Sequence, residues 1–99
     1  MVDIFLDGKD WRVADDVYRT FLKAVGAPHW HGHNFNALRD SITVGRINKI
    51  EIPYVIKIRN YGLIGADAKD MADNFVHFIG QLHESGFPVT VTIENKDSD

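Results

Sequence analysis

The chain has 99 residues, of which 44% are hydrophobic, so it can bury one core but is too short for two domains. It contains no cysteine and no apolar run long enough to cross a bilayer, which excludes a disulfide framework and a membrane-spanning helix. The first residues do not have the pattern of a signal peptide. We therefore expect a single domain over residues 1–99 that is cytoplasmic and does not contact a membrane.

The formal net charge is −3, but the charges are unevenly distributed. From His29 to Arg59 the chain carries five lysines and arginines and three histidines against two acids, whereas the remaining segments are acidic. Such an asymmetry often indicates where a charged partner binds. Five basic residues over this length are equally compatible with an ordinary solvated surface, so charge alone leaves both interpretations open.

The first part of the chain predicts a strand followed by a helix. Apolar side chains fall on one side of the segment from Val2 to Leu6, which is typical of a half-buried strand, and turn residues follow it. Asp15 or Asp16 is expected to cap a helix of roughly residues 15–25. Gly26, with a proline two residues later, is typical of the end of a helix.

A second helix is predicted after Asn34, which we expect to be its cap. Phe35, Leu38 and Ile42 recur at helical spacing and predict its buried side. Residues 45–53 are expected to form a loop. The outer side of this helix then carries four polar residues in one exposed ridge: Asn36, Arg39, Asp40 and Thr43.

The remaining elements are a strand, a long helix and a last strand. Residues 54–59 and 89–93 alternate as strands do, and residues 95–99 are expected to be a polar tail. Asp67 is expected to cap the long helix, whose predicted buried stripe consists of Met71, Phe75, Phe78 and Leu82. Strands separated by helices run parallel, and the polar alternate positions imply one uncovered face. We predict an α/β fold in which helices pack on one face of a three-stranded parallel sheet.

The segment Pro28–Asp40, with the sequence PHWHGHNFNALRD, resembles the signature of the barstar family. That signature reads Pro, any residue, two aromatics, Gly, any residue, Asn, Leu, Asp, Ala, Leu, Trp, Asp. The order of elements is similar too, and the likeness extends over nearly the whole chain. The resemblance implies a barstar-like fold and a protein that inhibits a ribonuclease by covering its active site with the second helix and the preceding loop.

The resemblance also implies which residues contact the partner. The family's contacts fall on Trp30, Gly32 and Asp40, which are kept, and on three positions that differ. Those are Asn36, usually Asp; Arg39, usually Trp; and Gln81, a Glu in barstar. With neighbouring residues added, the predicted partner-binding set is Trp30, His31, Gly32, Asn36, Arg39, Asp40, Thr43, Arg46 and Gln81. Trp and Arg are the residue types that most often dominate binding energy.

Simpler structural interpretations exist for several of these residues. Trp30, taken without the family pattern, is more typical of a side chain that covers the core. Gly32 is typical of a backbone with positive φ. His77 and Gln81 are typical of a solvated helix face. Asp40 has no such explanation, because it lies too far into its helix to cap the N-terminus.

Three other functions are considered. His29, His31 and His33 alternate in one loop, but no cysteine or carboxylate in that loop completes a metal site, and we expect no metal or cofactor. The same histidines with Lys57 resemble a ribonuclease site only loosely, and no nucleophile motif is present, so we expect no enzyme activity. The alternative that stays open is a small nucleic-acid-binding or RNA-processing domain using the basic, His-rich middle, although a pI near 5.9 argues against it.

The resemblance to the barstar family implies a cytoplasmic immunity protein against a bacterial nuclease toxin. We expect it to bind the ribonuclease one-to-one, to bind no nucleic acid directly, and to be monomeric when free.

Overall fold

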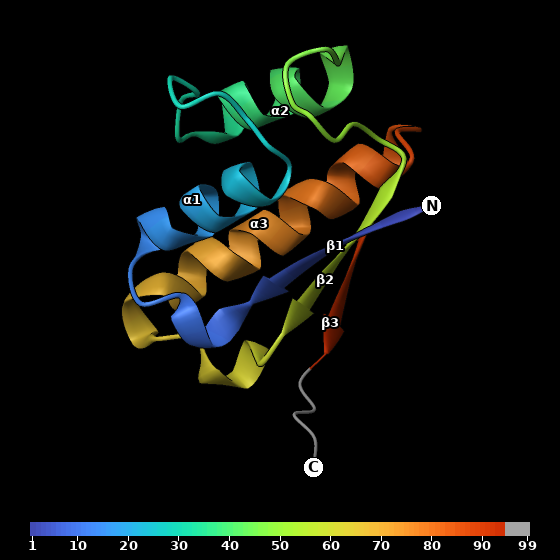
Figure 1. The fold of residues 1–99 in the computed structure, drawn as a ribbon. Helices are drawn as coiled ribbons and strands as arrows, with labels where there is room; N and C mark the ends of the chain where they lie inside the picture. The colour runs from blue at the N-terminus through green and yellow to red at the C-terminus, as the bar shows by residue number, and fades with distance from the viewer. Residues whose placement is uncertain (95–99) are drawn as a thin grey trace.

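Three parallel strands form the sheet of the computed structural model, which describes residues 1–94 (Figure 1). They are β1 (Val2–Asp7), β2 (Tyr54–Arg59) and β3 (Val89–Glu94), arranged in the order β1-β2-β3. Both pairings are parallel, with Ile4 opposite Ile56 and Ile56 opposite Val91. The predicted fold class is therefore confirmed, while the predicted tail at 95–99 lies outside the described residues.

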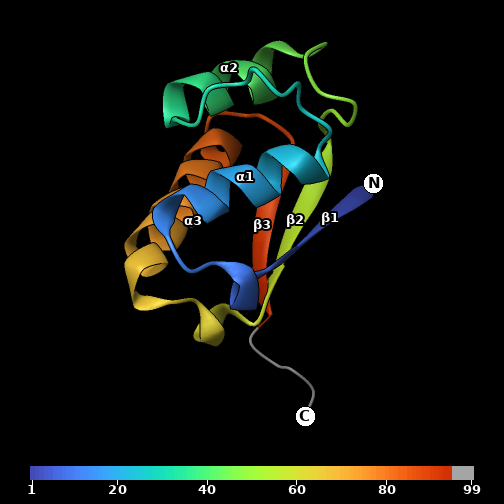
Figure 2. The same cartoon turned by 60° about the vertical axis from the view of Figure 1, so that its left-hand side comes forward.

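Two helices cover one face of this sheet. They are α1 (Ala14–Ala24), which packs against α3 and β1, and α3 (Ala66–Glu84), which also packs against β3. The third helix, α2 (Phe35–Val44), lies at one end of this helical layer rather than on the sheet, as Figures 1 and 2 show from two directions. No helix within residues 1–94 is long and apolar enough to span a membrane.

The core lies between the sheet and the helical layer. Tyr54, Ile56 and Ile58 of β2 are almost completely buried because β2 is the central strand and α1 and α3 lie over it. The predicted alternation holds less well at the sheet's edges, where Val2 and Ile93 are 48% and 44% exposed. Ile4 and Val89 of the same strands are buried, so this exposure is confined to the ends of the edge strands.

Two predicted helix caps are wrong. Val13, not Asp15 or Asp16, precedes the first turn of α1, and Asp16 lies inside that turn. Its carboxylate reaches back to accept the backbone N–H groups of Arg12 and Val13 at 2.9 and 3.1 Å. In the same way Asp67 lies in the first turn of α3, after Gly65. An aspartate in the first turn stabilises the N-terminus of a helix without being its cap residue. The sequence pattern therefore located the start of each helix but assigned the cap to the wrong residue.

The buried stripe of α3 also differs from the predicted one. Phe75 and Leu82 are buried as expected, but Met71 and Phe78 are only half-buried. The fully buried stripe consists of Ala68, Ala72, Phe75, Ile79 and Leu82. Ala68 and Ala72 are both fully buried, whereas Phe78 stacks on Phe35 of α2.

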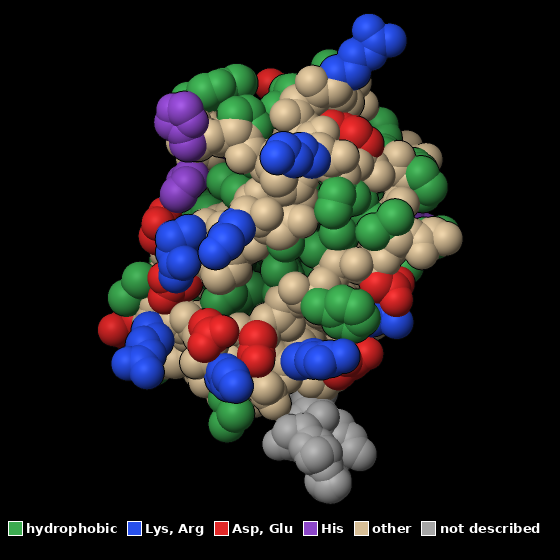
Figure 3. All heavy atoms as spheres, viewed as in Figure 1, with side chains coloured by type: hydrophobic (Ala, Val, Ile, Leu, Met, Phe, Trp, Pro, Cys, Tyr) green, Lys and Arg blue, Asp and Glu red, His purple; other side chains and the backbone are tan. Residues whose placement is uncertain are grey.

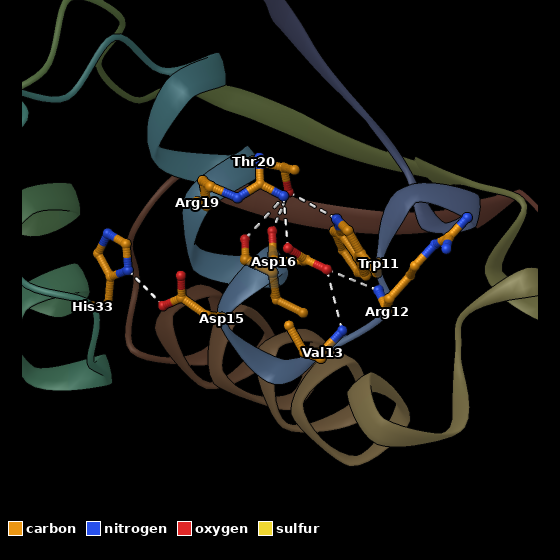
Figure 4. Close-up of polar contacts among 9 residues, drawn as sticks. Trp11, Arg12, Val13, Asp15, Asp16, Arg19, Thr20 and His33 are labelled. Atoms are coloured by element: carbon orange, nitrogen blue, oxygen red, sulfur yellow. Dashed lines mark hydrogen bonds and ion pairs between the residues drawn. The ribbon is translucent and has the colours of Figure 1, made fainter.

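The Asp16 contacts predict how stability depends on pH (Figure 4). A hydrogen bond from Arg19 at 2.6 Å, followed by the two backbone N–H groups, lowers the pKa of Asp16 from 3.8 to about 2. Because the folded pKa lies below the unfolded one, Asp16 stabilises the fold above about pH 4, and this contribution is lost as the pH falls towards about 2. We expect Asp16→Asn to lower the free energy of unfolding at neutral pH and to reduce its fall between those values, as measured by urea denaturation.

The matched control for this experiment is Asp70→Asn on the exposed surface of α3. The side chain of Asp70 makes no hydrogen bond or ion pair within the described part of the chain, so its replacement should leave the pH dependence of the parent unchanged. If Asp16→Asn loses stability on acidification as steeply as the parent, the contacts of Asp16 do not stabilise the helix start.

Candidate functional site

The position of α2 is fixed at both of its ends. At its start the side chain of Asn34 accepts the backbone N–H of Ala37 at 2.8 Å, which confirms the predicted cap. Near its end Asn48 donates its side-chain N–H to the buried hydroxyl of Ser41 at 2.7 Å. The carboxylate of Glu51 in turn accepts the backbone N–H of Asn48. The following loop is therefore tied to α2.

Aromatic side chains join α2 and its preceding loop to the other helices. Phe35 of α2 stacks on Phe78 of α3, with ring centroids 4.9 Å apart. Tyr18 of α1 contacts both Phe35 and His33. His33 also pairs with Asp15 of α1 through Nδ1 at 2.6 Å, as Figure 4 shows. The loop that leads into α2 is thus held against α1 before any partner binds.

Trp30 and Asp40 line one hollow, of about 190 Å³, beside the start of α2. Trp30 is 70% exposed, so the interpretation that it covers the core is wrong. The side chain of Asp40 is exposed as well and makes no hydrogen bond or ion pair with any other residue from 1 to 94. We call this the Trp30 hollow; its lining consists of Trp30, His31, Gly32, Ala37, Asp40 and Ile47.

Two members of this lining have structural roles that the sequence did not reveal. His31 is only 7% exposed, and its Nδ1 lies 2.8 Å from the carbonyl oxygen of Gly32, so it helps to hold the loop. Gly32 itself does not have the positive φ that we expected. A Cβ at this position would lie 3.1 Å from the side-chain nitrogen of Asn34, so the glycine leaves room for the cap of α2.

A second hollow, of about 350 Å³, lies between α2 and α3. It brings together Asn36, Arg39 and Gln81, the three predicted contacts that depart from the barstar pattern. We call it the α2–α3 groove; its full lining is Phe35, Asn36, Arg39, Asn74, His77, Phe78 and Gln81. Sequence reasoning missed Asn74 and interpreted His77 as solvated surface. Their spacing with Gln81, at i, i+3 and i+7, places all three on one face of α3 and was the available signal.

The two other predicted residues lie outside both hollows. The hydroxyl of Thr43 donates to the carbonyl oxygen of Arg39 at 2.7 Å, so it is engaged within α2. Arg46 is exposed beyond the end of α2, with a left-handed φ of 67°. Partner contacts by these two residues remain predictions.

The histidines and basic residues of the middle segment do not form one site. His31 and His33 engage different groups, and within residues 1–94 no three His, Cys, Asp or Glu side chains are placed to hold a metal ion. On the uncovered face of the sheet, Lys57 pairs with Asp3 at 3.2 Å and Arg59 approaches Glu94 at 3.6 Å. Figure 3 shows acidic and basic side chains interspersed over the side it displays, with histidines gathered at its upper left edge.

The parallel sheet with helices on one face defines a small α/β protein. Beside α2 the loop displays an exposed tryptophan next to a carboxylate that has no partner within residues 1–94, which makes a surface suited to a protein partner. The family model described as Barstar (barnase inhibitor) matches residues 1–94, and the chain belongs to the barstar family. Members of this family are inhibitors rather than enzymes. A search of curated proteins found no match to the chain.

Proposed function

We propose that this protein binds a ribonuclease and covers its active site, acting in the cytoplasm as an immunity protein against a bacterial nuclease toxin. The observation that carries the proposal is the Trp30 hollow, in which an exposed tryptophan lies beside an exposed aspartate that has no partner among residues 1–94. Membership in the barstar family supports the same function.

The chemistry of the Trp30 hollow suits a basic side chain of the partner. An arginine placed there would pair with the Asp40 carboxylate and stack on the Trp30 ring. A cleft that binds the phosphates of RNA supplies such arginines and lysines, because phosphate recognition depends on positive charge. Asp40 would then occupy the place of a substrate phosphate, and the bulk of α2 would exclude RNA.

The loop is organised for such binding in the free protein. The Asn34 cap and the contacts of His33 with Asp15 and Tyr18 restrain the segment that carries Trp30. Restraint before binding reduces the conformational entropy lost on association, so more of the contact energy is realised as affinity.

We expect the purified chain to cleave no RNA and to abolish RNA cleavage by its partner at one equivalent. The partner is obtained as the product of the adjacent open reading frame or by affinity capture with the tagged chain. A captured protein is accepted as the partner only if it cleaves RNA by itself. The measurement is cleavage of a fluorogenic RNA at increasing inhibitor concentration. Arg12→Gln, an exposed site outside both hollows, is the matched control and should titrate like the parent.

Two outcomes would contradict the proposal. RNA turnover by the chain alone that disappears on replacing His31 or His33 would show an enzyme. Retention of RNA by the chain on a filter at low salt, with release at high salt and no effect on the ribonuclease, would instead support the nucleic-acid-binding alternative.

A further inference from the structure

The α2–α3 groove differs in chemistry from the Trp30 hollow. Its lining supplies one fixed positive charge, from Arg39, and its polar neighbours are the amides of Asn36, Asn74 and Gln81. No Asp or Glu is among the lining residues. On the face of α3 that borders the groove, the acids Asp70 and Glu84 lie outside the lining on either side of it. The groove therefore offers hydrogen-bond donors and one cation to an occupant.

Part of the groove wall is apolar. Phe35 and Phe78 stack on each other with an interplanar angle of 20°, and both line the groove. Aromatic rings beside a charged group displace water and lower the local dielectric, so a charge pair formed there is stronger than one on the open surface. The guanidinium of Arg39 makes no hydrogen bond or ion pair with the rest of the described chain, and its planar shape lets it donate two parallel hydrogen bonds to one carboxylate.

We infer that the α2–α3 groove receives an acidic side chain of the ribonuclease partner, with Arg39 pairing the carboxylate and the amides completing its hydrogen bonds. This inference rests on the proposed function for the identity of the occupant. The binding surface then has two halves of opposite sign, because consecutive residues of α2 point about 100° apart: Asp40 towards the Trp30 hollow and Arg39 towards the groove. A partner must present a basic and an acidic side chain at matching positions, which an enzyme with a uniformly basic cleft does not do.

The groove can be tested without the partner. Phenylacetate combines an aromatic ring with a carboxylate, phenethylammonium carries the opposite charge on a similar frame, and phenylacetamide is a neutral analogue. We expect phenylacetate to shift the side-chain amide NMR signals of Asn36, Asn74 and Gln81 saturably, with a Kd in the low millimolar range for a ligand of this size. The two analogues should bind at least ten times more weakly.

Two variants locate the interaction. Arg39→Gln should weaken phenylacetate binding at least tenfold, whereas Arg12→Gln removes an arginine elsewhere and should leave binding unchanged. Equal or tighter binding of phenethylammonium, no saturable binding of phenylacetate, or full binding by folded Arg39→Gln would each overturn the inference. None of these results bears on whether the chain inhibits a ribonuclease. Conversely, a chain that inhibits no ribonuclease would leave the measured binding of phenylacetate to the groove unaffected.

Discussion

Replacing Asp40 by alanine is expected to weaken binding of the ribonuclease partner by about 30-fold or more while leaving the thermal stability of the free protein nearly unchanged. Loss of one member of a desolvated charge pair commonly costs about 2 to 5 kcal/mol in binding, and 2 kcal/mol corresponds to about 30-fold. The side chain of Asp40 is exposed and has no partner within residues 1–94. Alanine is more favourable than aspartate in a helix by under about 1 kcal/mol, so the substitution should not lower the stability of the fold.

The loss should come mainly from faster dissociation, which surface plasmon resonance resolves from association. The matched control is Asp10→Ala, an exposed aspartate that lies outside both hollows and away from the face of α3 that borders the groove, and this variant should bind like the parent. If Asp40→Ala binds as tightly as the parent, or loses binding only because it unfolds, Asp40 does not anchor the complex. The contact surface would then have to be sought first at Trp30 and Arg46.

The fold was predictable because its signals are local and repeated. Period-two alternation identified β2, where the three alternate apolar residues Tyr54, Ile56 and Ile58 are all buried. Asn34 followed by apolar residues at helical spacing identified α2, and the cap is present. The errors lie where a local signal has two meanings, since an acid near a helix start can be the cap or, like Asp16, can lie one turn inside and reach back.

The site was only partly predictable because it depends on distances between segments far apart in the chain. The family pattern indicated Trp30 and Asp40, and the structure places both in one hollow. Nothing in the local sequence shows that Arg39 and Gln81 line the same groove, because that depends on how α2 crosses the end of the helical layer. The stack of Phe35 on Phe78 joins these helices and explains why Phe78 is only half-buried, although the sequence pattern placed it in the buried stripe of α3.

The two tryptophans were not distinguishable by residue type, yet the structure gives them opposite environments. Trp11 follows a 3₁₀ turn at Gly8–Asp10 and has polar neighbours, so no periodicity marked it as a core residue. It is nevertheless completely buried, and its indole N–H donates to the hydroxyl of Thr20 at 2.7 Å (Figure 4). Trp30 is 70% exposed at the edge of its hollow.

We therefore expect alanine at these two positions to have opposite effects. Trp11→Ala should lower the free energy of unfolding by about 3 to 5 kcal/mol, because it leaves a cavity in the core and removes the hydrogen bond from the indole to Thr20. Such a loss is a large part of the total stability of a small domain. Trp30→Ala should change stability by less than about 1 kcal/mol, because the ring is mostly in water, yet weaken partner binding at least tenfold.

Urea denaturation and partner affinity, both measured on each variant, separate the two roles. If Trp11→Ala does not fold at all, Trp11→Phe keeps most of the ring volume, loses the hydrogen bond to Thr20, and should be destabilised by a smaller amount that can still be measured. At a temperature where it remains folded, that variant should bind the partner as the parent does, since Trp11 touches neither hollow. A folded Trp11 variant that has lost binding, or a Trp30→Ala variant that is strongly destabilised but binds normally, would show that these two roles have been assigned to the wrong residues.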